Sequence, residues 1–248
     1  MTDLGKDFKK YALSEGISSM NLHYFEKNLV ENSMTPYILE EREMRVTQMD
    51  IFSRLMRDRI LWVAGVVNTQ MSTVVQAQLM YLDSVEKKDI TLHIDSPGGS
   101  VLAGLGMVDV MRYIKSDVQT INTGMAASMG SILLSSGTKG KRASLNFSKV
   151  MIHQVSSGAS GHVEDNRISQ MESEKYNYIL FKMLAENSGR DFDYVLESAR
   201  RDNWLNAQEA LDFGFIDEVL ITEKSTPITT YLEGFEDYYK KEVLKMKS

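Results

Sequence analysis

The sequence predicts an α/β domain in which strands and helices alternate and pack in layers. Short apolar runs of strand length recur along the chain, at residues 59–67, 89–95, 118–122 and 149–154. Between them lie segments whose apolar residues recur at helical spacing, at residues 72–82 and 100–116. Strands that alternate with helices in this way indicate an α/β layered domain.

The composition is that of an ordinary globular protein and excludes several classes. A chain of 248 residues with 43% hydrophobic and 25% charged residues can form one large domain, with or without an appendage. The net charge of −6 argues against a nucleic-acid-binding protein. No cysteine is present, which excludes disulfides and thiolate chemistry. No membrane span or secretory signal is recognisable, so we expect a cytoplasmic protein.

The first part of the chain consists of an N-terminal extension and the first elements of the layered domain. Residues 1–34 are a polar lead that we expect to be an N-terminal extension, either mobile or removed by processing. Residues 37–47 are predicted to be extended, and a short amphipathic helix follows from Asp50. The strand at 59–67 is continuously apolar, as expected for a strand covered on both faces. Ser72 is the expected N-cap of the next helix.

The central part carries the small residues. The strand at 89–95 leads into the turn Ser96-Pro97-Gly98-Gly99, where glycines free the backbone, and the helix at 100–116 follows. The strand at 118–122 then passes through a Thr-Gly turn into a predicted helix of small residues at 126–137. A turn at 138–141 precedes the strand at 149–154.

The last part is more polar. A flexible loop at 156–161 precedes a long helix at 163–187, which we expect to pack on another subunit because its apolar stripe is modest. The stripe consists of Ile168, Met171, Tyr178, Leu180 and Leu184. Helices at 192–201 and 207–213, a strand at 215–221 and a charged tail at 222–248 complete the chain. The tail is expected to form an exposed or partner-bound helix.

Ser128 and His153 are the candidate reactive residues. Ser128 stands at a helix start, where unpaired N–H groups could hold an oxyanion, and His153 ends a strand. Residues at strand C-termini gather at one sheet edge, which makes a Ser–His pair reasonable. The composition does not identify which Asp or Glu would orient the histidine. The small residues could instead serve only close packing, and a metal site at His153 and His162 lacks a third ligand at suitable spacing.

Several collinear motifs resemble one family. They are Asp95-Ser-Pro-Gly-Gly-Ser100, Gly124-Met-Ala-Ala-Ser-Met-Gly130, Lys139-Gly-Lys-Arg142 and Val150-Met-Ile-His-Gln154. Together they closely resemble the proteolytic subunit (ClpP) family of the Clp protease, over a span from about Pro36 to Ile221. The resemblance implies a crotonase-like fold of repeated ββα units at residues 35–221. It also implies that residues 155–187 form a protruding handle.

The resemblance also implies a Ser-His-Asp serine endopeptidase. Ser128 corresponds to the nucleophile, His153 to the base and Asp202 to the carboxylate that orients the imidazole. The backbone N–H groups of Gly99 and Met129 correspond to the oxyanion hole. No metal or other cofactor is implied in this chain.

The implied assembly is a barrel of two stacked heptamers. An AAA+ unfoldase such as ClpX would use ATP to deliver unfolded polypeptides, while cleavage itself is independent of ATP. The partners are thus further copies of the chain, the unfoldase, polypeptide substrates and, in a mixed ring, a second subunit of the same type.

The chain departs from the family pattern at several positions. Val155 stands where proline is usual, and Arg200 stands where an acid usually pairs across the rings. On the outer surface, Thr91, His93 and Ala143 replace frequent aromatic docking residues, whereas Tyr113 keeps one. These departures predict altered substrate pairing, ring contact and unfoldase docking.

Two other functions stay open at this stage. The chain could be a structural subunit that is silent alone or active only in a mixed ring, as the departures suggest. It could also be an acyl-CoA hydratase or isomerase of the wider crotonase-like class, which would need no serine nucleophile.

Overall fold

The computed structural model describes residues 37–42, 45–156 and 162–243. The N-terminal extension expected at 1–34 and most of the loop expected at 156–161 lie outside these residues. The chain divides into two compact units, Met1–Arg57 and Asp58–Ser248. The first unit contains an antiparallel hairpin of β1 (Tyr37–Arg42) and β2 (Arg45–Asp50), followed by helix α3 (Ile51–Arg57).

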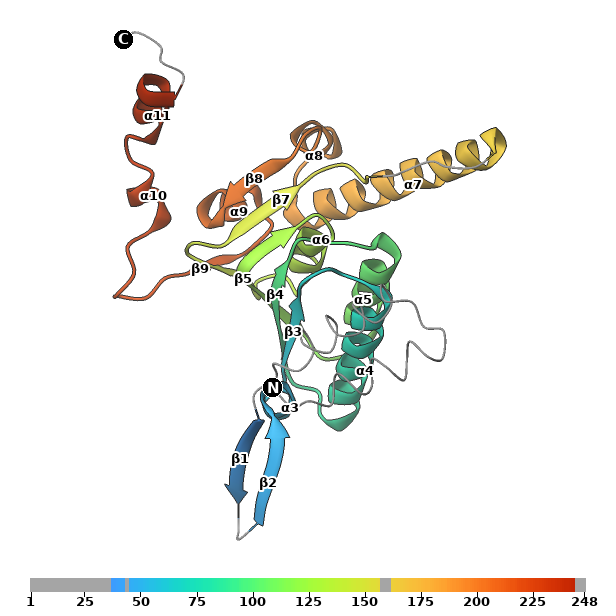
Figure 1. The fold of residues 1–248 in the computed structure, drawn as a ribbon, viewed down its shortest axis with the longest axis vertical. Helices are drawn as coiled ribbons and strands as arrows, with labels where there is room; N and C mark the ends of the chain where they lie inside the picture. The colour runs from blue at the N-terminus through green and yellow to red at the C-terminus, as the bar shows by residue number, and fades with distance from the viewer. Residues whose placement is uncertain (1–36, 43–44, 157–161, 244–248) are drawn as a thin grey trace, which may run out of the picture. The chain divides into compact units, whose positions relative to one another are not determined.

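A seven-stranded, mainly parallel sheet forms the centre of the second unit. Its parallel path runs in the order β3 (Ile60–Ala64), β4 (Ile90–Ser96), β5 (Val118–Ala127), β6 (Arg142–Leu145) and β9 (Glu218–Leu220). β5 is long enough to pair with two neighbours: its first half pairs with β6, and its end pairs with β7 (Lys149–Ile152). β7 also pairs antiparallel with β8 (Asn203–Asn206). The predicted α/β class is confirmed, and the sheet is mainly parallel (Figure 1).

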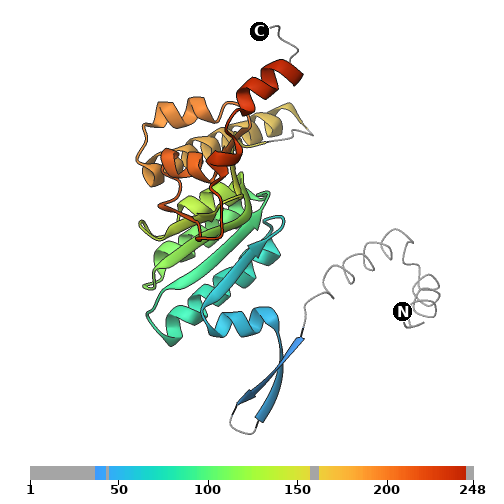
Figure 2. The ribbon, with the colours of Figure 1, turned by 90° about the vertical axis from the view of Figure 1, so that its left-hand side faces the viewer.

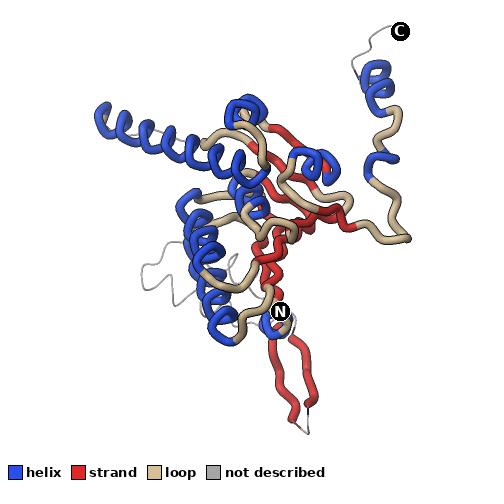
Figure 3. The backbone as a smooth tube through the Cα atoms, turned by 180° about the vertical axis from the view of Figure 1, so that it is seen from behind, coloured by secondary structure: helices blue, strands red, loops and turns tan. Residues whose placement is uncertain are grey.

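Two helices, α4 (Thr69–Val85) and α5 (Val101–Tyr113), lie side by side along one face of this sheet (Figure 3). Both helices and the strands beside them carry buried apolar residues, which together form the core. Figure 2 shows the helices layered against the strands. Core members include Val63, Leu79, Leu92, Ile94 and Met107. This alternation of apolar strand runs and helical stripes is what the sequence predicted.

The expected N-cap of α4 is wrong. Asn68 caps the helix, because its side chain accepts a hydrogen bond from the Met71 N–H (2.9 Å). Ser72 instead lies inside the helix, buried, and its hydroxyl donates to the Ala103 carbonyl of α5 (2.6 Å). Serine is thus used here to join two packed helices, since a buried hydroxyl needs a partner.

The long helix α7 (Val163–Ser188) has two halves of different character. Its buried residues all lie in the C-terminal half (Leu180, Phe181, Met183, Leu184 and Ala185), whereas Ile168 and Met171 in the N-terminal half are 57% and 54% exposed. The prediction that the whole stripe packs on another subunit is therefore wrong for Leu180 and Leu184, which are buried within this chain. Gly189 ends the helix in a left-handed conformation (φ 72°). Two short helices follow, α8 (Phe192–Ser198) and α9 (Ala207–Phe213).

The C-terminal tail is not the single helix expected. It contains α10 (Ile228–Tyr231), α11 (Phe235–Tyr238) and a π-helical turn, Tyr239–Val243. Buried Asn146 anchors its start, with Nδ2 donating to the Thr226 carbonyl and Oδ1 accepting from the Ile228 N–H. No helix of the described chain has the length and apolar character that crossing a bilayer requires.

Candidate active site

Ser128 lies at the turn between β5 and α6 (Met129–Ser135) in an unusual backbone conformation. Its φ of 54° and ψ of −119° are costly for a residue with a side chain, by about 1–3 kcal/mol. The Ser128 N–H donates to the Met151 carbonyl of β7 (2.8 Å), which fixes the turn against the sheet. A strained strand-to-helix turn presents a hydroxyl outward, as nucleophile elbows do. The helix predicted at 126–137 therefore starts later, because Ala126 and Ala127 still belong to β5.

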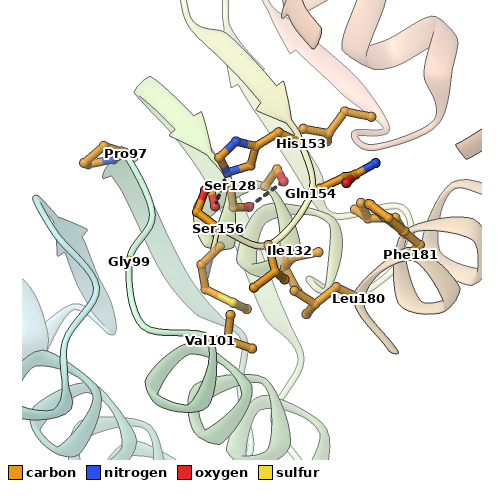
Figure 4. A pocket seen from close by; sticks show the side chains of 15 residues that line it. Pro97, Gly99, Val101, Ser128, Ile132, His153, Gln154, Ser156, Leu180 and Phe181 are labelled. Atoms are coloured by element: carbon orange, nitrogen blue, oxygen red, sulfur yellow. Dashed lines mark hydrogen bonds between the residues drawn. The ribbon is translucent and has the colours of Figure 1, made fainter. Parts of the chain in front are cut away.

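His153 and Asp202 meet through the pairing of β7 with β8. Ile152 is paired with Asn203, so the next residues, His153 and Asp202, follow the same antiparallel register. The distance between His153 Nδ1 and Asp202 Oδ1 is 3.2 Å. His153 Nε2 lies 2.9 Å from Ser128 Oγ, and Figure 4 shows these two side chains together. With the proton on Nδ1, the imidazole donates to the carboxylate and accepts from the serine hydroxyl. The His153 side chain is 24% exposed and that of Asp202 is 64% exposed.

The three residues are far apart in sequence, and no local pattern joins them. β8 is four residues long and was not predicted from the sequence. Without β8, spacing alone could not select Asp202 among 34 acidic residues. The resemblance to a family supplied that choice, and the structure brings the carboxylate to His153.

The Gly98-Gly99 turn lies directly against the Ser128 turn. A Cβ on Gly98 would lie 2.7 Å from the Ser128 Cβ and 2.8 Å from the Met129 nitrogen. A Cβ on Gly99 would lie 2.3 Å from the Val67 carbonyl oxygen. Only glycine permits both close approaches, and both residues also have positive φ (90° and 148°).

Two backbone N–H groups beside Ser128 are unpaired within the described chain. Val67 and Gly99 form a β-bridge through two hydrogen bonds. The Val67 N–H donates to the Gly98 carbonyl, and the Ser100 N–H donates to the Val67 carbonyl. Neither bond uses the Gly99 N–H. Met129 is the first residue of α6, where N–H groups have no partner within the helix. Both residues line the same cavity as Ser128.

A cavity of about 250 Å³ opens beside Ser128 and His153. One wall is polar and carries Gln154 and Ser156, whereas the rest is mainly apolar (Figure 4). The apolar wall is formed by Val101, Ile132, Ile152, Leu180, Phe181 and Leu184. The size and lining suit an apolar side chain. The sequence did not predict this cavity, although two residues of the predicted apolar stripe of α7, Leu180 and Leu184, line it.

The residues expected on the outer surface lie in different environments. Tyr113 is 79% exposed, but Ala143 is 3% exposed and is therefore not available for docking in this chain. His93 stacks on Trp62, with ring centroids 4.6 Å apart. Burial lowers the pKa of His93. Within the described chain, no group of three or more His, Cys, Asp and Glu residues is arranged to hold a metal ion.

Comparisons with known proteins give the family. A sequence model of the Clp protease family matches residues 41–223. This chain belongs to the Clp protease family. It is 50% identical to the ATP-dependent Clp protease proteolytic subunit of Bacteroides fragilis (strain YCH46) over 217 residues, 87% of this chain and 98% of the relative. The subunit of the same name from Bacteroides thetaiotaomicron gives the same values.

A third relative, the ATP-dependent Clp protease proteolytic subunit of Porphyromonas gingivalis, is 44% identical over 86% of this chain and 97% of its own length. Membership of the Clp protease family confirms the predicted enzyme class, a serine endopeptidase. It disfavours the alternative of an acyl-CoA hydratase or isomerase.

Proposed function

We propose that this Clp protease family member cleaves polypeptides with Ser128 as nucleophile, His153 as general base and Asp202 as the group that orients the imidazole. The observation that carries the proposal is the continuous contact from Ser128 Oγ to His153 Nε2 (2.9 Å) and from His153 Nδ1 to Asp202 (3.2 Å). This is the arrangement that serine peptidases of unrelated folds share.

In the proposed reaction, Ser128 Oγ attacks the peptide carbonyl carbon while His153 Nε2 takes the hydroxyl proton. The tetrahedral oxyanion accepts hydrogen bonds from the Gly99 and Met129 N–H groups, each typically worth about 10²–10³ in kcat. His153 then gives its proton to the leaving amine as the C–N bond breaks. Water attacks the acyl-enzyme, again with His153 as base, and releases the new carboxylate.

The cavity beside Ser128 supports binding of an apolar side chain of the substrate, with the peptide extended along residues 154–156. Within the described chain, the backbone groups of Gln154 and Ser156 have no hydrogen-bond partners. An open backbone edge of this kind can accept an added strand. Main-chain pairing of this type would give little sequence specificity.

The proposal includes the assembly implied by the family. We expect two stacked heptamers, or a mixed ring with a second subunit, that are fed by an AAA+ unfoldase such as ClpX. The exposed apolar residues of the N-terminal half of α7 support contact with another copy. ATP would be used by the unfoldase, and this chain would need no metal or other cofactor. The lack of cysteine fits the cytoplasm, where we place the protein.

Labelling with a serine-reactive β-lactone, followed by mass spectrometry, tests the nucleophile. We expect one adduct on Ser128 in the parent protein and none in Ser128→Ala. The alternative of a silent structural subunit predicts no adduct on a folded, assembled ring, and that result would overturn the proposed activity. Cleavage of an unfolded protein with and without the unfoldase and ATP then tests the partner.

A further inference from the structure

One hydrogen bond ties α7 to the chain that carries His153. The Val155 N–H, two residues after His153, donates to Oδ1 of Asn177 at 2.6 Å. Within the described chain, this is the one hydrogen bond found between α7 and residues 154–156. Proline at position 155 would have no such N–H. The contact therefore depends on the presence of valine, or another residue with an N–H, at this position.

Asn177 occupies a position in α7 where the helical pattern calls for an apolar residue. Leu180, Phe181 and Leu184 follow it at spacings of three, four and seven residues, so all four share one face. The other three are buried and line the cavity beside Ser128. Asn177 extends this face by one turn with a polar group. Its carbonyl oxygen lies where a free backbone N–H needs an acceptor.

The segment that Asn177 holds has few other supports. β7 ends at Ile152, and His153 follows at once, outside the strand pairing. Gln154, Val155 and Ser156 then form one wall of the cavity (Figure 4). Beyond the end of β7, the Val155–Asn177 bond is the one hydrogen bond within the described chain that holds the backbone of residues 154–156. The His153 ring makes its own hydrogen bonds to Ser128 and Asp202, and both depend on where the adjoining backbone places the ring.

We propose that Asn177 is a positioning residue that aligns His153 with Ser128 by holding the Val155 backbone. The proposal rests on the proposed peptidase function. Asn177 does not touch the reacting atoms and acts only through the backbone of residues 153–155. Displacing a base by about 1 Å can cost on the order of 10²-fold in rate, so one backbone hydrogen bond can matter for turnover.

The test removes the bond from each side. Asn177→Ala deletes the acceptor, Val155→Pro deletes the donor, and Asn177→Asp keeps an acceptor oxygen. For cleavage of a short fluorogenic peptide, we expect Asn177→Ala to lower kcat about tenfold while KM stays within twofold. The rate at which a fluorophosphonate labels Ser128 should fall by a similar factor, because this reaction needs His153 but no added strand. Asn177→Asp should recover most of both rates.

Combining Asn177→Ala with Val155→Pro tests whether both substitutions act through the same hydrogen bond. If the bond acts as a unit, Asn177→Ala causes no further loss in the Val155→Pro background. Lys175→Ala is the matched control, because Lys175 lies on the same helix and pairs with Glu172 on its exposed side. Its rates should stay within twofold of the parent. Should Asn177→Ala fail to fold, Val155→Pro provides the same test from the donor side.

Hydrogen exchange separates this proposal from the proposed function. The Val155 amide should exchange at least tenfold faster in Asn177→Ala than in the parent, and also when both proteins carry Ser128→Ala. A parent that is never labelled overturns the peptidase function, whereas unchanged exchange at Val155 overturns the role of Asn177. A rise in KM without a fall in kcat or in labelling rate also overturns it, because Asn177 would then shape only the substrate edge.

Discussion

At the scale of single residues, the backbone of Ser128 is held in a costly conformation by what surrounds it. The Met151 carbonyl accepts its N–H, and Gly98 leaves room for its Cβ. Strain of this kind persists only where the neighbouring structure fixes it, and it concentrates at reactive sites. The two turns should therefore behave as one unit in catalysis.

Gly98→Ala tests whether catalysis depends on the close contact between the Gly98 and Ser128 turns, rather than on the positive φ of Gly98 alone. The new Cβ would lie 2.7 Å from the Ser128 Cβ and 2.7 Å from the Ala127 carbonyl oxygen, so the Ser128 turn must shift. We expect kcat/KM for a peptide to fall by about 10²-fold or more. Gly140→Ala is the matched control, because Gly140 has a similar φ (84° against 90°) but nothing within 4 Å of its Cβ position. Equal losses in the two variants would contradict the packing argument.

His93 offers a pH-dependent prediction. Burial lowers its pKa, and its Nδ1 has no hydrogen-bond partner in the described chain. The unfolded chain binds a proton at this histidine below about pH 6.5, whereas the folded chain resists it until a lower pH. Stability should therefore fall as the pH drops below about 6.5. His93→Phe, which keeps a ring on Trp62, should lose this part of the pH dependence.

Melting temperatures measured between pH 7.5 and 5.5 give the comparison. The fall in melting temperature across this range should be smaller for His93→Phe than for the parent. His162→Gln, which removes an exposed imidazole, serves as the control. Identical slopes in the parent and His93→Phe would show that His93 does not contribute.

At the scale of elements, the sequence predicted those that carry an apolar pattern and missed β6 and β8. Strands β3, β4 and β7 and helices α4, α5 and α7 carry such patterns. β6 and β8 are as short as β7, but their sequences, Arg-Ala-Ser-Leu and Asn-Trp-Leu-Asn, contain no comparable apolar run, and pairing with distant strands places them. The boundary near Ser128 was missed because alanine and glycine carry no clear periodicity. Tertiary pairing, not local preference, extends β5 to Ala127.

Arg142 of β6 connects this strand to α6, to α7 and to Asp217, the residue before β9, and gives the prediction at this scale. It is 3% exposed and forms a two-pronged ion pair with Asp217, at 2.8 Å and 2.6 Å. It also donates to the carbonyls of Ser135 and Asn187, near the ends of α6 and α7. Burial raises the pKa of Asp217, but the hydrogen bonds and charge of Arg142 outweigh it and leave that pKa below its usual value.

Arg142→Met should leave the Asp217 charge and two helix-end carbonyls without their partner. We expect a loss of about 3–5 kcal/mol in the free energy of unfolding, measured by urea titration at pH 7. Because the folded pKa of Asp217 is lowered, this contribution is complete at neutral pH and is lost as the pH falls below about 4. Arg167→Ala breaks an exposed pair with Glu164 and should change stability by less than about 1 kcal/mol. Similar losses in both variants would contradict the role assigned to Arg142.

At the scale of the whole molecule, the family determines more than local patterns could. Ser128 and His153 were visible from the sequence as a strand-end serine and histidine, but Asp202 and the two N–H groups needed the resemblance. The cavity could not be predicted, because its walls come from α5, α6, β7 and α7 and meet only in the folded chain. The tail after residue 223 lies beyond the family match, and its aromatic residues Tyr231, Phe235 and Tyr238 are exposed, in line with the exposed or partner-bound segment that the sequence led us to expect.

The exposed half of α7 carries the last prediction. Ile168 and Met171 are more than half exposed on a helix that extends past the sheet (Figure 1). Apolar residues gathered on such a surface favour contact with another protein chain. Replacing both with aspartate should convert the proposed double ring into single heptamers, because two charges per chain would be buried at the contact. Gln170→Asp adds a charge at an exposed polar position between them and should leave the double ring intact. Native mass spectrometry reports the assembly directly, and a fully assembled double ring in the Ile168→Asp, Met171→Asp protein would show that this face of α7 does not join the rings.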